Sequence, residues 1–156
     1  MHPDVSRELF EIESKRISEN DDLLLDRGLL VLACSYPYFT VAAKHRSTGK
    51  IRVFRFKFDD WNDLPPALSL TDGETGEDLP GKLWPTDRLG HWHASGWISE
   101  AGIETAIPFM CMVGIREYHR HKSHIGDKWE NYRNQPGFDL PGIVLKVIEV
   151  FQKSNV

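Results

Sequence analysis

Cys111 is the residue of this chain whose type and surroundings best suit chemistry. It lies in the apolar stretch 108–115. A polar run follows with four candidate partners for the thiol: Glu117, His119, His121 and His124. A thiol at such a boundary suits attack on a carbonyl or the binding of a metal, because both tasks need a thiolate with cationic or proton-accepting neighbours and partial access to solvent.

A zinc site is one use of these residues, since zinc takes four ligands in a tetrahedral array and Cys111 with Glu117, His119, His121 or His124 would supply them. On a strand, the alternating residues Glu117, His119 and His121 would share one face. Against a zinc site, no Cys-x-x-Cys pair is present and basic residues are interspersed among the histidines. A solvated edge strand is an equally good interpretation of the run.

Catalysis is the other use, and it makes Cys111 and His119 the predicted catalytic residues. His119 is separated from Cys111 by an even number of positions, so on an unbroken strand the two would share a face and His119 would accept the proton of an incoming amine. A cysteine hydrolase using Cys111, His119 and Glu117 is a further alternative. The plain alternative is that Cys111 is a small buried hydrophobe.

Composition limits the classes of function. A chain of 156 residues predicts one domain, residues 1–156, which folds without disulfides or metal. The formal charge is −4, with 19 basic and 23 acidic residues, so the basic surface that nucleic acid requires is not expected. No apolar run approaches the roughly 20 residues of a membrane span, and the N-terminus lacks the pattern of a signal peptide. We therefore expect a cytosolic protein with reduced thiols and no nucleic-acid or membrane partner.

Two helices are predicted from the spacing of apolar residues. The first covers residues 4–18, where Val5, Leu9 and Ile12 recur at helical spacing. The second covers residues 140–152, opens at Asp139 and carries one apolar stripe.

Four strands are predicted between the helices, at residues 29–36, 38–45, 50–58 and 67–70. The first is a continuous apolar run that reads as well buried and places Cys34 in the core. In the third, phenylalanines alternate with basic residues, and the opposite phase of Val53 predicts a bulge near that residue. The stretch to Met110 reads as irregular and held by tryptophans. The predicted fold class is therefore α+β, with a four-stranded antiparallel meander flanked by the two helices.

This order of elements resembles the ubiquitin-conjugating enzymes. Residues 56–58, Phe-Lys-Phe, followed by 64–68, Leu-Pro-Pro-Ala-Leu, look like that family's strand and its Pro-Pro turn. Residues 109–112, Phe-Met-Cys-Met, resemble the apolar flank of its active-site cysteine. Trp129 and the segment 139–143, Asp-Leu-Pro-Gly-Ile, are similar to its downstream tryptophan and helix. The resemblance spans most of the chain.

Two stretches depart from the family pattern. Where the family carries His-Pro-Asn before the cysteine, this chain has His-Trp-His-Ala at residues 91–94. The histidine-rich run after Cys111 is the second departure, and it is similar to a divergent bacterial branch from ubiquitin-like conjugation operons. A metal-binding family with a Cys, Glu and His signature, associated with such systems, would also fit Cys111, Glu117 and His119.

The resemblance implies a carrier enzyme without a cofactor. It would accept the C-terminus of a ubiquitin-like modifier protein on Cys111 from an activating enzyme and transfer it to a target protein. The alternative is a non-enzymatic metal-binding or adaptor module on the same fold.

Overall fold

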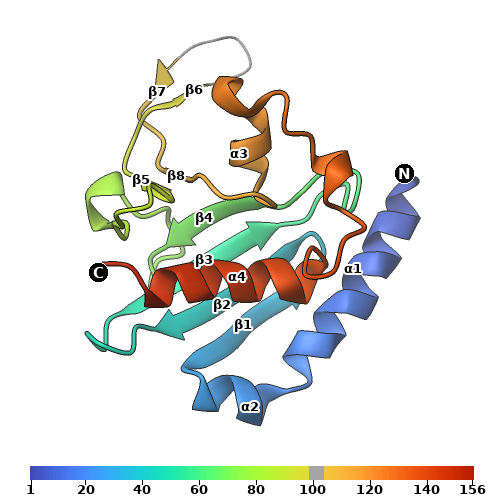
Figure 1. The fold of residues 1–156 in the computed structure, drawn as a ribbon. Coiled ribbons are helices and arrows are strands. Elements are labelled where there is room, and N and C mark those ends of the chain that lie inside the picture. The colour runs from blue at the N-terminus through green and yellow to red at the C-terminus, as the bar shows by residue number, and fades with distance from the viewer. Residues whose placement is uncertain (99–103) are drawn as a thin grey trace.

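The structure is a computed structural model that describes residues 1–98 and 104–156. It has an α+β fold with one four-stranded sheet, as the sequence predicted (Figure 1). Its first half contains two helices and the four long strands: α1 (Pro3–Ser18), α2 (Asp21–Asp26), β1 (Leu29–Ser35), β2 (Tyr38–Lys44), β3 (Ile51–Lys57) and β4 (Ala67–Thr71). Its second half contains four two-residue strands and two helices: β5 (Trp92–His93), β6 (Trp97–Ile98), β7 (Glu104–Thr105), β8 (Phe109–Met110), α3 (Arg116–Arg120) and α4 (Leu140–Gln152). Short 3-10 turns lie at Gly81–Leu83, Lys122–His124 and Trp129–Asn131.

The main sheet is an antiparallel meander in the order β1-β2-β3-β4. Helix α4 lies across one face of this sheet and α1 runs along the side of β1 (Figure 1). Asp139 caps α4 by accepting a hydrogen bond from the Gly142 amide at 2.9 Å. The two predicted helices are confirmed to within one residue at each end.

The core lies between α4 and the face of the sheet that it covers. Alternating side chains of β3 point into it, and Phe54, Phe56 and the following Phe58 are fully buried. The apolar stripe of α4 packs against them: Leu140, Ile143, Val144, Val147, Ile148 and Phe151. The ring centroids of Phe54 and Phe151 are 5.2 Å apart in an edge-to-face contact.

Two predictions about the sheet are wrong. Strand β1 is largely exposed, and Cys34 is exposed with it. The reason is that β1 is the edge strand of an antiparallel sheet whose second face is open to solvent, so a continuous apolar run did not require burial on both faces. The bulge expected near Val53 is also absent, because β2 and β3 pair in unbroken register. The irregularity lies instead between Val31 and Ala33 in β1.

The elements from β5 to α3 form a smaller layer beyond β4 (Figure 1). The stretch predicted to be irregular carries the short pairs β5-β8 and β6-β7. Strand β8 and helix α3 both contact β4. Trp92 of β5 donates a hydrogen bond to the Ser154 hydroxyl at 2.7 Å, which ties this layer to the end of α4. None of the helices within the described residues has the length and apolarity to cross a membrane.

Candidate functional site

Cys111 directly follows β8 and is half-buried. Its amide donates a hydrogen bond to the His91 carbonyl at 2.7 Å, which continues the β5-β8 pairing by one residue. The preceding side chain, Met110, is fully buried in the core. Loss of hydration raises the pKa of the Cys111 thiol, so at neutral pH the thiol needs a proton acceptor before it can react as a thiolate.

His124 is the side chain that is placed to accept this proton. Its Nε2 lies 3.5 Å from Cys111 Sγ, the distance of a sulfur hydrogen bond. The imidazole stacks on the Tyr118 ring with centroids 4.1 Å apart and planes inclined by 20°. The stack holds the ring from one side while its Nε2 faces the thiol.

Asp127 fixes Tyr118 in turn. The Tyr118 hydroxyl donates to Asp127 Oδ2 at 2.5 Å, and the Tyr132 hydroxyl donates to Oδ1 at 2.7 Å. These two hydrogen bonds lower the pKa of Asp127, so the carboxylate remains ionised as the acceptor of both. Burial and the hydrogen bond to Asp127 raise the pKa of Tyr118, which therefore stays neutral as a donor. The chain of contacts from Asp127 through Tyr118 to His124 pre-orients the imidazole beside Cys111.

His119 lies next to this network but does not face the thiol. The Gly114 amide donates to His119 Nε2 at 3.1 Å, so Nδ1 carries the ring proton and donates to the Asp127 carbonyl at 2.7 Å. Burial lowers the pKa of His119, which favours this neutral tautomer. Both ring nitrogens are thus occupied in holding the loop 113–127 together. The catalytic role predicted for His119 stays a prediction, and the geometry favours His124 in its place.

The histidine-rich run brings His124 beside Cys111, but it does not form a strand. Residues 116–120 form α3 and residues 122–124 a 3-10 turn. Gly114 adopts a left-handed φ of 93°, which turns the chain sharply after Cys111 and ends the extended conformation. The even spacing of Cys111 and His119 therefore does not place the two side chains on one face.

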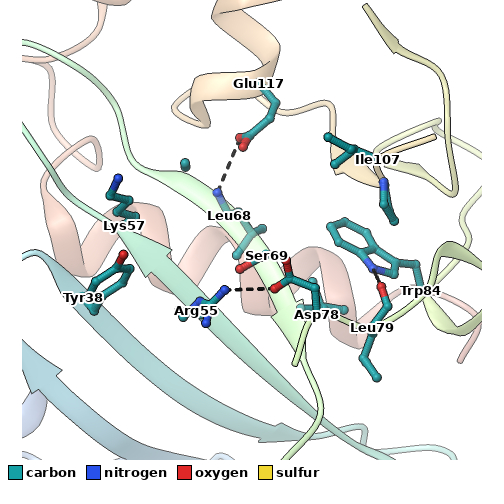
Figure 2. A pocket seen from close by; sticks show the side chains of 13 residues that line it. Tyr38, Arg55, Lys57, Leu68, Ser69, Asp78, Leu79, Trp84, Ile107 and Glu117 are labelled. Carbon is teal, nitrogen blue, oxygen red and sulfur yellow. Dashed lines mark hydrogen bonds and ion pairs between the residues drawn. The ribbon is translucent and has the colours of Figure 1, made fainter. Parts of the chain in front are cut away.

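Because the run is helical, the five residues considered as metal ligands do not converge. The Glu117 carboxylate points instead to the backbone of β4, where the Leu68 amide donates to its Oε2 at 3.4 Å (Figure 2). Over residues 1–98 and 104–156, no three His, Cys, Asp or Glu side chains are grouped as ligands of a metal ion. The hydrolase combination of Cys111, His119 and Glu117 is likewise not assembled.

In the stretch 91–94, His91 and His93 make structural contacts. His91 Nδ1 lies 2.5 Å from Asp87 Oδ2. The His93 ring stacks on the Phe109 ring, with centroids 4.5 Å apart, and Phe109 stacks on His121 at 5.9 Å. The His121 ring in turn lies 5.9 Å from the His124 ring. These side chains brace the thiol's surroundings rather than contact it.

This arrangement is suited to acyl transfer. A nucleophilic thiol with an adjacent imidazole, and a third group that orients the imidazole, is the pattern of an activated cysteine. Sequence reasoning missed Tyr118, Asp127 and Tyr132, and it preferred His119 to His124 as the proton acceptor. No local pattern distinguishes them, because their contacts cross a helix and two turns.

Two comparisons with known proteins bear on this region. Residues 97–153 match the model of the Y4jH family. The matched stretch contains Cys111, His124, Asp127 and all of α4. The chain is also 26% identical over 170 residues to the uncharacterised protein y4jH of Sinorhizobium fredii (strain NBRC 101917 / NGR234), an alignment that covers 94% of this chain and 82% of that protein. Neither match bears on ubiquitin-like conjugation.

The two cysteines are expected to react differently with a maleimide in the native protein. Cys34 is exposed, whereas Cys111 is half-buried and its pKa is raised, so Cys34 should be modified first at pH 7. The labelling of Cys111 should accelerate as the pH rises, because its thiolate then forms. Mass spectrometry of partially labelled protein gives the order, with Cys34→Ser and Cys111→Ser as matched controls. Faster labelling of Cys111 at pH 7 would mean that its thiolate is stabilised.

Proposed function

We propose that this protein is a thioester-forming carrier of a ubiquitin-like conjugation pathway, with Cys111 as the acceptor thiol. The modifier arrives as a thioester on an activating enzyme and leaves on an amine of a target protein. The observation that carries the proposal is the 3.5 Å contact between Cys111 Sγ and His124 Nε2. The proposal takes His124, rather than His119, as the proton acceptor.

In the first step Cys111 Sγ attacks the carbonyl carbon of the incoming thioester. The S–H proton passes to His124 Nε2, a new C–S bond forms, and the old C–S bond breaks. The departing thiolate of the activating enzyme takes the proton back. One thioester replaces another, so the step needs a base for the thiol but no cofactor.

In the second step the amine nitrogen of the target attacks the same carbonyl carbon. A C–N bond forms and the bond to Cys111 Sγ breaks. The amine loses a proton to His124, and Cys111 regains its thiol.

The fold supports the proposal at a coarser level. A four-stranded antiparallel meander with an N-terminal and a C-terminal helix is the architecture that the resemblance to ubiquitin-conjugating enzymes implies. A fold of this kind does not by itself establish an activity, which has to be argued from the site. His91 contacts Asp87 and His93 contacts Phe109, so neither side chain takes the place of the asparagine of His-Pro-Asn.

The test is loading of the purified protein by an activating enzyme charged with a ubiquitin-like protein, with ATP. We expect an adduct on a non-reducing gel that disappears with a thiol reductant. Cys111→Ala should abolish it, Cys111→Ser should give a reductant-stable ester or none, and Cys34→Ser should load normally.

An adduct that survives in Cys111→Ala would place the acceptor elsewhere and reject the proposal. Failure of every variant to load, with an activating enzyme shown to load itself, would favour the non-enzymatic adaptor alternative. For the metal-binding alternative the decisive result is one zinc per chain that is lost from a Cys111→Ala, His124→Ala double variant.

A further inference from the structure

The His91 side chain lies on the same face of the β5-β8 pair as the Cys111 thiol. Trp92 pairs with Met110, and both side chains are buried on the other face. The next pair along is His91 with Cys111, joined by the hydrogen bond from the Cys111 amide to the His91 carbonyl at 2.7 Å. Directly opposed side chains of an antiparallel pair share a face, with Cβ atoms about 4.5–5.5 Å apart. His91 is therefore a neighbour of the thiol across the strand pair.

The same face shows that opposed side chains meet. His93 lies opposite Phe109, and their rings are stacked with centroids 4.5 Å apart and planes inclined by 6°. In the described part of the chain, the Cys111 sulfur is hydrogen-bonded to His124 and not to His91. His91 is thus close to the sulfur without being bonded to it, so its ring stays available to a group that approaches an acylated Cys111.

Asp87 fixes the orientation and the tautomer of His91. Asp87 Oδ1 accepts from the His91 amide at 2.9 Å, and Oδ2 lies 2.5 Å from His91 Nδ1. A carboxylate only accepts hydrogen bonds, so Nδ1 carries the ring proton and Nε2 presents a lone pair. Within residues 1–98 and 104–156, Nε2 has no hydrogen-bond partner. His91 is therefore an oriented imidazole whose basic nitrogen is not in use.

The Asp87 carboxylate is itself held firmly. Its side chain is only 9% exposed, which limits screening of its charge by water. The preceding residue, Thr86, exchanges two backbone hydrogen bonds with Asn155, at 2.7 and 3.0 Å. A buried carboxylate that orients an imidazole, and offsets the charge that the ring gains on protonation, is the arrangement of a catalytic base.

Transfer to a lysine requires more than one proton acceptor. A lysine side chain arrives as the ammonium ion, because its pKa in water is about 10.4. One proton must leave before the nitrogen has a lone pair with which to attack, and a second leaves as the C–N bond forms. In the proposed second step His124 takes the later proton, so the earlier one needs another acceptor.

We infer that His91, oriented by Asp87, is the catalytic base that activates a primary amine for attack on acylated Cys111. The ammonium proton passes to His91 Nε2, and the electron pair of the broken N–H bond stays on the nitrogen as the attacking lone pair. The imidazolium is balanced by the Asp87 carboxylate and returns its proton to solvent after the transfer. This inference rests on the proposed carrier function and specifies its acceptor as a protonated primary amine, such as a lysine side chain.

The test separates acylation of Cys111 from its discharge. In a Cys34→Ser background, a small benzyl thioester acylates Cys111, excess reagent is removed, and intact-protein mass spectrometry follows the acyl group. His91→Gln keeps a donor to Asp87 but has no basic nitrogen, so discharge onto Nα-acetyl-lysine amide at pH 7 should slow by about 10²-fold or more. Discharge onto hydroxylamine, which is uncharged at pH 7, should change by less than about threefold.

His93→Gln is the matched control, because it makes the same change two residues away on the same face. His93 contacts the Gly90 carbonyl and the Phe109 ring, so discharge onto either nucleophile should stay within about threefold of the unmodified protein. Asp87→Asn should slow discharge onto the lysine amide at least about tenfold and spare hydroxylamine, since Asp87 acts through His91. A purely structural role of either residue would slow both nucleophiles alike.

The inference is overturned if His91→Gln discharges onto the lysine amide as fast as His93→Gln does, or if it slows both nucleophiles equally. A Cys111 that the thioester never acylates would reject the proposed carrier function and this inference together. Normal acylation, followed by discharge that His91→Gln leaves unchanged, would reject this inference alone.

Discussion

Replacing His124 with phenylalanine is expected to slow acyl transfer to Cys111 by about 10²- to 10⁴-fold, the usual contribution of a general base. Phenylalanine keeps an aromatic ring to stack on Tyr118 but has no nitrogen to take the thiol proton. Because burial raises the pKa of the Cys111 thiol, little spontaneous thiolate is present at neutral pH to compensate. The measurement is the second-order rate of Cys111 acylation by a small benzyl thioester, in a Cys34→Ser background.

His121→Phe is the matched control for this variant. His121 belongs to the same run, and its ring lies 5.9 Å from that of His124, but its Nδ1 is paired with the Ser123 hydroxyl. It should acylate within about threefold of the unmodified protein, since surface substitutions away from a site have small effects. In His124→Phe the rate should recover as the pH approaches the thiol pKa, whereas a variant that merely misfolds would stay slow at every pH. Equal rates for the two variants at pH 7 would remove His124 from the mechanism.

The second large effect is expected in the core: Phe54→Ala should lower the free energy of unfolding by about 3–5 kcal/mol. Phe54 is fully buried between the sheet and α4, with its ring 5.2 Å from Phe151 and 6.4 Å from Trp92. Truncation removes this apolar contact and leaves a cavity where α4 and β5 meet the sheet. Urea unfolding followed by tryptophan fluorescence and circular dichroism measures the change.

Leu32→Ala provides the comparison on the edge strand. Leu32 belongs to a run that the sequence alone would place in the core, yet 48% of its surface is exposed. Its truncation should change stability by no more than about 0.5 kcal/mol. A loss near 3 kcal/mol at Leu32 would mean that the open face of the sheet is covered in solution, by a partner or a second copy of the chain.

The positions of Tyr118 and Asp127 explain how a surface histidine can serve as a base. An imidazole on a short turn would otherwise sample many orientations, and restricting it to the reactive one would cost conformational entropy during the reaction. The stack on Tyr118 and the hydrogen bond from Tyr118 to Asp127 restrict it beforehand. Trp129 packs between the same loop and the core, since its ring centroid lies 5.8 Å from that of His119 and 6.0 Å from that of the buried Trp61.

The sequence by itself determined two long helices, the four long strands between them and their order. The helical spacing of the stripe in α4, the cap at Asp139 and the alternating phenylalanines of β3 are local patterns, and local backbone geometry is enough to interpret them. They fixed the α+β class and the four-stranded meander. They also singled out Cys111, because an apolar strand meeting a polar run is visible without knowledge of any contact.

Only the tertiary structure decided which faces are covered and which side chains meet. The exposure of Cys34 follows from the edge position of β1, which depends on strand order rather than on residue type. The choice of His124 over His119 follows from the turn at Gly114 and the helical α3, which together redirect the polar run. Such contacts join residues through loops whose path is set by packing against distant elements, so no spacing rule along the chain could have predicted them.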